Sequence, residues 1–167
     1  MTHNTITLIG MPGAGKSSVG VLLAKQVGLN FVDTDLLIQV QVGKTLQEIM
    51  DEQGHNRLRS LEQEVLLGAP LDKMLVATGG SAVYSKPGMQ RLQSAGPVVF
   101  ISVPLPVLDS RIDNEDQRGI ARSPGQSFAD IYAERLPLYE KYADVTVAGD
   151  AGSVESIATM IARQLGY

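Results

Sequence analysis

The hydrophobic positions along this chain form short runs that alternate between strand-like and helix-like spacing. Residues 5–9 are rich in β-branched side chains and stop at Gly10, which predicts a first strand. After the glycine-rich turn, apolar residues recur on one helical face as far as Gly28, which is typical of a helix that ends at a glycine. Short apolar runs predict further strands at residues 31–32, 75–77, 98–101 and 145–147, of the kind found in buried parallel sheets.

Helical patterns separate these runs. Thr45 and Glu48 have the spacing of a capping box, so we expect a helix to begin there. Residues 55–68 are helix-like, and an amphipathic pattern over residues 154–165 predicts a last helix. Strands that alternate with helices imply a parallel sheet with right-handed crossovers, so we predict one α/β domain over residues 1–167 with three layers, α/β/α.

One stretch, residues 114–127, differs from the rest because it is polar and short of large apolar side chains. A segment of this kind buries little surface, so we expect it to be mobile.

The strongest motif is the stretch from Gly10 to Ser17, which matches the P-loop pattern G-x-x-x-x-G-K-[ST] at every fixed position. Its glycines let backbone N–H groups converge on phosphates, and the helix that follows presents its positive end to the same anion. Lys16 is predicted to reach the β- and γ-phosphates of ATP, and the Ser17 hydroxyl to ligate Mg²⁺. The predicted phosphate-binding residues are Gly13, Ala14, Gly15, Lys16, Ser17 and Ser18.

Two acidic residues follow the second predicted strand. The runs at 75–77 and 98–101 do not end in Asp, and no Asn-Lys-x-Asp guanine signature occurs, which weakens a GTPase or motor interpretation. Asp33 is therefore the predicted second contact to the metal, and Asp35 the group that accepts a proton from a substrate hydroxyl. The alternative is a pair of solvated acids, with Asp35 as a helix N-cap.

Several weaker features follow these motifs along the chain. In sequence order they are Arg59 with Glu62, the turn Thr78-Gly79-Gly80, Arg111, Arg118, and the run from Arg135 to Tyr139. Taken singly, Arg59 and Arg135 are typical of arginines on a helix surface. Taken together with the P-loop and the sequence from Phe31 to Asp35, they make the chain resemble the shikimate kinase family over nearly its whole length.

The resemblance implies a five-stranded parallel sheet of order 2-3-1-4-5 and ATP-dependent phosphorylation of the 3-hydroxyl of shikimate. It implies that Asp35 engages the substrate hydroxyls and that Arg59 and Arg135 clamp the carboxylate, a task suited to a bidentate guanidinium. The remaining implied positions are Gly79 and Gly80 as backbone contacts to the substrate, Arg118 on a lid over about 114–127 as a catalytic group beside Lys16 and Asp35, and Arg111 near the adenine.

The chain also departs from the family pattern. Leu58 replaces an aromatic residue, Ser81 replaces a third glycine, Gln39 replaces a glutamate, and residues 119–121 read Gly-Ile-Ala where the family reads Pro-Leu-Leu. A glycine after Arg118 leaves that arginine less preorganised than a proline does. Two alternatives stay open on these grounds: a kinase for another small hydroxy-carboxylate, and a nucleotide-binding regulatory protein that has lost catalysis.

The composition of the chain limits the kinds of partner that it is expected to bind. A net charge of −4 argues against a nucleic-acid partner bound through a broad basic surface. The absence of cysteine is compatible with a reducing cytosol, and no signal peptide or membrane span is visible. We expect a cytoplasmic monomer whose ligands are ATP, Mg²⁺ and a small hydroxylated carboxylate.

Overall fold

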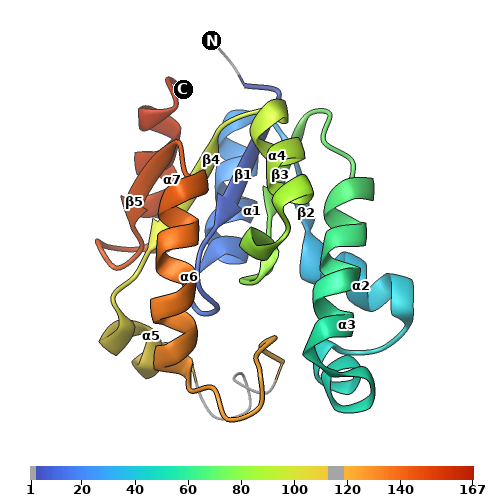
Figure 1. The fold of residues 1–167 in the computed structure, drawn as a ribbon. Coiled ribbons are helices and arrows are strands. Elements are labelled where there is room, and N and C mark those ends of the chain that lie inside the picture. The colour runs from blue at the N-terminus through green and yellow to red at the C-terminus, as the bar shows by residue number, and fades with distance from the viewer. Residues whose placement is uncertain (1–2, 113–118) are drawn as a thin grey trace.

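A central parallel sheet with helices on both faces organises the chain, as seen in a computed structural model that describes residues 3–112 and 119–167 (Figure 1). The sheet has five strands in the order β2-β3-β1-β4-β5, and every neighbouring pair is parallel. This confirms the order that the family resemblance implies. The strands are β1 (Thr5–Ile9), β2 (Asn30–Asp33), β3 (Met74–Ala77), β4 (Val98–Ser102) and β5 (Val145–Ala148).

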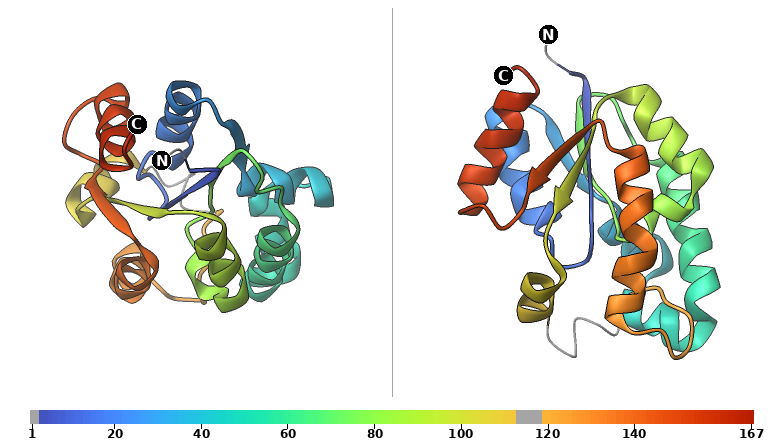
Figure 2. Two further views of the ribbon diagram at one scale, coloured as in Figure 1. Left: turned by 90° about the horizontal axis from the view of Figure 1, so that it is seen from above. Right: turned by 60° about the vertical axis from the view of Figure 1, so that its left-hand side comes forward.

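Helices cover both faces of this sheet, which confirms the predicted three layers. Figure 2 shows α1 and α7 on one face and α3, α4 and α6 on the other. The helical elements are α1 (Lys16–Val27), α2 (Thr34–Val42), α3 (Leu46–Gly68), the 3₁₀ turn η1 (Ala82–Tyr84), α4 (Lys86–Ala95), α5 (Leu105–Arg111), α6 (Phe128–Tyr142) and α7 (Val154–Gln164). None of the helices in the described ranges has both the length and the apolar character needed to cross a bilayer.

The strand register determines where functional side chains gather. Leu8 and Asp33 both pair with Ala77, so β1, β2 and β3 end at the same edge of the sheet. The P-loop, the acidic residues after β2 and the turn after β3 therefore emerge side by side, at the lower edge in Figure 1. β2 is an edge strand, so Phe31 and Val32 are half-buried instead of fully buried as the apolar run suggests.

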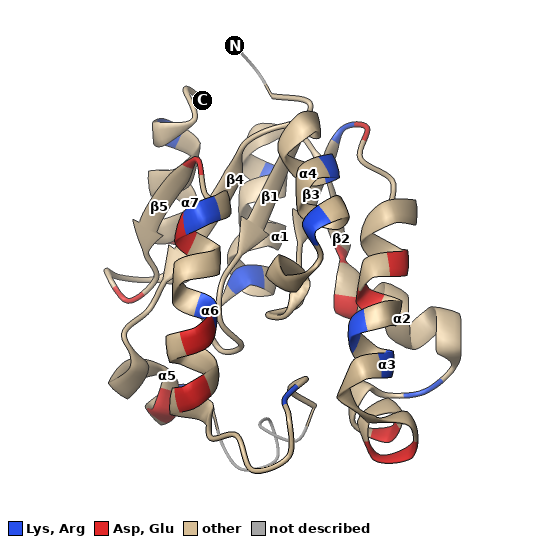
Figure 3. Ribbon diagram, viewed as in Figure 1, with Lys and Arg blue, Asp and Glu red and all other residues tan. Residues whose placement is uncertain are grey.

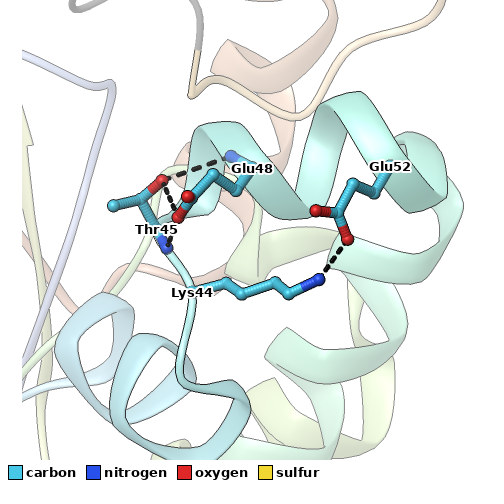
Figure 4. Close-up of polar contacts among 4 residues, drawn as sticks. All are labelled: Lys44, Thr45, Glu48 and Glu52. Carbon is cyan, nitrogen blue, oxygen red and sulfur yellow. Dashed lines mark hydrogen bonds and ion pairs between the residues drawn. The ribbon is translucent and has the colours of Figure 1, made fainter.

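The start of α3 follows the predicted capping box. Thr45 Oγ1 accepts a hydrogen bond from the backbone N–H of Glu48 (3.2 Å), and the Glu48 carboxylate accepts one from the Thr45 N–H (2.7 Å; Figure 4). Lys44 and Glu52 form an ion pair beside it. α3 bends at Gly54, whose φ is 76°, and then continues as the segment that faces the site.

Charge on the surface is mixed. Figure 3 shows basic and acidic segments interspersed along α3 and α6. This distribution agrees with the low net charge of −4.

Candidate active site

The P-loop lies between β1 and α1 and forms a compact turn. Gly15 occupies the N-cap of α1 with a φ of 92°, a left-handed conformation that glycine adopts without strain. A Cβ on Gly13 would come within 2.7 Å of the Ile112 side chain, so this position also requires glycine. Because Gly15 has no side chain to cap α1, the first N–H groups of the helix are left to an anion.

Lys16 points back into this loop. Its Nζ donates to the carbonyl oxygens of Gly10 (2.7 Å) and Met11 (2.9 Å), and only 8% of the residue is exposed. Burial lowers the pKa of Lys16 to about 8, although the nearby charge of Asp35 opposes the shift. A cation held here is suited to binding phosphate oxygens.

Ser17 and Asp33, the two residues predicted to contact the metal, lie in direct contact. Ser17 Oγ donates to Asp33 Oδ2 at 2.5 Å. The other carboxylate oxygen of Asp33 accepts the N–H of Asp35 (2.9 Å), so Asp33 is the N-cap of α2. The alternative in which Asp35 caps this helix is therefore wrong.

This oxygen pair fits Mg²⁺ in chemical type. A hydroxyl and a carboxylate are hard oxygen ligands, and Mg²⁺ bound with a nucleotide uses one or two carboxylates together with phosphates and waters. Within residues 3–112 and 119–167, no group of three or more His, Cys, Asp or Glu side chains is arranged to hold a metal. Mg²⁺ bound at such a pair would take its remaining ligands from phosphates and waters.

A cavity of about 350 Å³ opens beside the P-loop. Arg111 borders it from the end of α5 and donates to the carbonyl oxygens of Gly13 (3.3 Å) and Gly149 (3.1 Å). Its contact with the adenine remains a prediction. The cavity is lined by Pro12, Gly13, Gly15, Lys16, Ser17, Ser18, Asp35, Thr78, Arg111 and Ile112.

A second, smaller cavity of about 180 Å³ shares Asp35 and Pro12 with the first. Leu58, which replaces an aromatic residue of the family pattern, forms part of its wall, and Arg135 closes one side. Burial is the main cause of the raised pKa of Asp35, about 6, and the charge of Asp33 adds to it. The cavity is lined by Pro12, Asp35, Ile38, Leu46, Leu58, Glu62, Gly80, Ser81, Gly119, Ile120, Ala121 and Arg135.

Arg135 is buried, which contradicts the alternative of an ordinary helix-surface arginine. Only 1% of the residue is exposed; Nη2 donates to the Ala121 carbonyl (2.6 Å), and Nε is buried without a partner. A Cβ on Gly80 would lie 2.9 Å from Arg135 Nη1, so glycine permits this approach. The Gly80 carbonyl accepts the hydroxyl of Tyr139 (2.5 Å), which holds the turn in place.

Arg59 lies next to this cavity but not in its wall. Its guanidinium carbon is 4.0 Å from the centroid of the Tyr84 ring, and its Nε is also buried without a partner. It lines an adjoining cavity of about 350 Å³ with Ser60, Glu62, Gln63, Ser81, Tyr84 and Ser85. The two predicted clamp arginines thus approach from α3 and α6 toward the same region.

Glu62 is a site residue to which the sequence assigned no role. It is 3% exposed, Ser81 Oγ donates to its Oε2, and its Oε1 is buried without a partner. Burial and the charge of Asp35 raise the pKa of Glu62 to about 7. Its position three residues after Arg59 places both side chains on one face of α3, and this spacing is the feature of the sequence that could indicate its place in the site.

The predicted lid falls partly outside the described residues, and Arg118 is among the residues that are not described. In residues 119–127, Ile120 and Ala121 are 5% and 4% exposed, contrary to the expectation that this stretch buries little. Both residues line the smaller cavity beside Asp35. The mobility of the segment and the catalytic role of Arg118 stay predictions.

Comparisons with known proteins identify relatives over nearly the full chain. The family model described as shikimate kinase matches residues 12–166. A shikimate kinase of Thermodesulfovibrio yellowstonii is 33% identical over 95% of this chain and 93% of its own, and one of Xanthomonas campestris is 36% identical over 95% and 90%. The solved structure of a shikimate kinase from Acinetobacter baumannii in complex with shikimate has a TM-score of 0.88 at 30% identity, covering 98% of this chain and 93% of that one.

Proposed function

The chain belongs to the shikimate kinase family, and on this premise we propose that its site transfers the γ-phosphoryl group of ATP to the 3-hydroxyl of shikimate. It is a kinase that uses ATP to phosphorylate an alcohol. The proposal concerns which residues of this chain perform each part of that reaction.

One observation carries the assignment of roles: Asp35 lines both the P-loop cavity and the smaller cavity beside Arg135. A carboxylate shared by two cavities lies where a hydroxyl in one can meet a phosphoryl group in the other. Phosphoryl transfer depends on this alignment, because the attacking and leaving oxygens must be roughly in line.

This alignment supports one path for the reaction. The acceptor hydroxyl passes its proton to Asp35 while its oxygen forms a bond to the γ-phosphorus, and the bond from that phosphorus to the bridging oxygen of ADP breaks. A pKa near 6 leaves Asp35 ionised at neutral pH and still basic enough to accept the proton. Lys16 balances charge on the β- and γ-phosphates. Mg²⁺ held through Ser17 and Asp33 would neutralise phosphate charge.

The acceptor is oriented by its carboxylate. Arg135 and Arg59 each carry an unpartnered buried Nε, and guanidinium groups bind carboxylates with two parallel hydrogen bonds. Backbone N–H groups of the Gly79-Gly80 turn would contact the substrate hydroxyls, and Arg118 would stabilise charge on the transferring phosphoryl group. A monomeric state and a cytoplasmic location are part of the same proposal.

The experiment is a coupled assay of ADP release by the purified protein, with and without shikimate. We expect ADP release to rise steeply with shikimate and to require Mg²⁺. Absence of stimulation at millimolar shikimate would refute the substrate assignment.

A second acceptor is favoured by one observation, since Leu58, Ile120 and Ala121 form the cavity wall in place of the family residues. A panel of other hydroxy-carboxylates in the same assay tests it. A higher kcat/KM for one of these acids than for shikimate would reassign the substrate while keeping the kinase chemistry.

A further inference from the structure

Tyr84 lies against both arginines that face the acceptor. Its ring centroid is 4.0 Å from the guanidinium carbon of Arg59 and 5.4 Å from that of Arg135. Tyr84 is the last residue of η1, the single turn that directly follows the Gly79-Gly80 turn and Ser81. The segment from Gly79 to Tyr84 therefore provides both the backbone proposed to contact the substrate and an aromatic ring beside Arg59 and Arg135.

Stacking on an aromatic face restricts an arginine in a useful way. A guanidinium that lies over a ring keeps its in-plane N–H groups free to bind a carboxylate from the side. In the described part of the chain neither Arg59 nor Arg135 forms an ion pair with an acidic side chain. The ring of Tyr84 therefore restricts the rotation of the Arg59 guanidinium.

The tyrosine is itself fixed at its hydroxyl. Tyr84 donates to Glu134 Oε1 at 2.5 Å, and Glu134 lies on α6 next to Arg135. Glu134 Oε2 accepts a second bond from Gln126 Nε2 (2.9 Å), and Gln126 Oε1 accepts the backbone N–H of Ser123 (3.2 Å). A continuous path of contacts thus runs from Arg59 to the described end of the predicted lid.

We propose that Tyr84 is a positioning residue for recognition of the acceptor's carboxylate: its ring orients Arg59, and Glu134 and Gln126 tie that ring to residues 123–126. This inference rests on the proposed function, because it assumes an acceptor that carries a carboxylate. Holding Arg59 in its binding orientation before the acceptor arrives reduces the entropy lost on binding.

The test compares Tyr84→Leu, Tyr84→Phe and the control Tyr132→Leu, which makes the same change at a half-buried tyrosine of α6 that does not line the site. Steady-state rates give KM for shikimate, KM for ATP and kcat, and thermal melting checks that each variant is folded. For Tyr84→Leu we expect KM for shikimate to rise about 5- to 20-fold, in line with the loss of a partly desolvated cation–π contact. Its kcat and its KM for ATP should stay within about twofold of the wild type.

Tyr84→Phe keeps the ring and loses only the bond to Glu134, so we expect a rise in KM of about two- to fourfold. Shikimate methyl ester, which has no negative charge, provides a second readout that a purely structural role would not change. Tyr84→Leu should bind this ester as the wild type does.

The outcomes separate the two proposals. If shikimate does not stimulate the wild-type protein, the proposed function fails and this inference fails with it. If the wild type is stimulated, the inference alone is overturned by any one of three results: an unchanged KM in Tyr84→Leu, equal losses in Tyr84→Phe and Tyr84→Leu, or an equal loss for shikimate and its methyl ester.

Discussion

Asp35 and Glu62 direct their carboxylates to the same side of Gly79, although they come from different helices. A Cβ on Gly79 would lie 2.5 Å from Asp35 Oδ1 and still closer to Glu62 Oε1. Two acids are thus held together in a buried place, and burial raises the pKa of both. The absence of one methyl group at Gly79 makes this arrangement possible.

Replacing Gly79 by alanine should therefore disturb the acids directly. We expect Gly79→Ala to lower the free energy of unfolding by about 1–3 kcal/mol through overpacking, and to reduce kcat/KM for shikimate. Gly68→Ala is the matched control, since a Cβ at this last residue of α3 meets nothing within 4 Å and should raise stability by about 0.4–1 kcal/mol. Urea denaturation of both variants measures the difference. Equal stability of the two would contradict the close approach at Gly79.

The raised pKa values also predict how stability varies with pH. Asp35 and Glu62 hold protons more tightly in the folded chain, with pKa values of about 6 and about 7, than in the unfolded chain, where they are near 4. Their contribution to stability is therefore complete at low pH and is lost as the pH rises through about 6 to 7. In Glu62→Gln, the free energy of unfolding should fall less steeply as the pH rises toward 7.

Denaturant titrations at several pH values between 5 and 8 measure this change. Glu140→Gln, at an exposed position of α6, serves as the control and should leave the pH profile unaltered. A profile for Glu62→Gln that runs parallel to the wild type would show that Glu62 is ionised throughout this range.

The roles proposed for Lys16 and Asp35 predict two different losses of activity. Lys16→Met should abolish shikimate-dependent ADP release, because the phosphates lose their cation. Asp35→Asn should lower kcat by about 100- to 10,000-fold, the usual range for a positioned general base, while ATP binding is retained. Calorimetric titration with ATP measures whether Asp35→Asn retains ATP binding. An unaltered rate in Asp35→Asn would refute its role as the base.

The proposed contact between Arg135 and the acceptor's carboxylate predicts that binding requires a guanidinium at this position. Arg135→Lys retains the charge but cannot form two parallel hydrogen bonds, so we expect KM for shikimate to rise about 10- to 100-fold. Part of this change reflects the lost contact with the Ala121 carbonyl. Arg91→Lys is the control, since Arg91 also donates to backbone carbonyls but lies outside the site. A comparable rise in KM for Arg91→Lys would mean that replacing any arginine that donates to backbone carbonyls has this effect, and not only one in the site.

Local sequence patterns predicted the fold to a large extent. The β-branched run of β1, the glycines of the P-loop and the capping box of Thr45 are determined by neighbouring residues, and all three lie where the sequence places them. No element was predicted for α4 or α5, whose short segments begin next to proline and have no long apolar repeat. Sheet order came from the family resemblance, because pairing between distant strands leaves no local pattern.

The site was predictable where a motif defines it and less so elsewhere. Lys16 and Ser17 are assigned by the P-loop motif, and Asp33 by its place at the end of a predicted strand. The burial of Arg135, the bond from Ser81 to Glu62 and the stacking of Arg59 on Tyr84 depend on how α3, η1 and α6 pack against one another. Such contacts join residues far apart in sequence, so composition and periodicity do not reveal them.

Because Asp35 and Pro12 line both cavities, one compound could occupy the two together, which has a consequence for inhibitor design. A single compound that joins a nucleotide-like part to an acceptor-like part would need only a short linker past this carboxylate. A hydrogen-bond donor placed in that linker would meet Asp35 in its ionised form. Compounds of this kind would gain affinity from both halves at once, and the gain should disappear when Asp35 is replaced by a residue that cannot accept the bond.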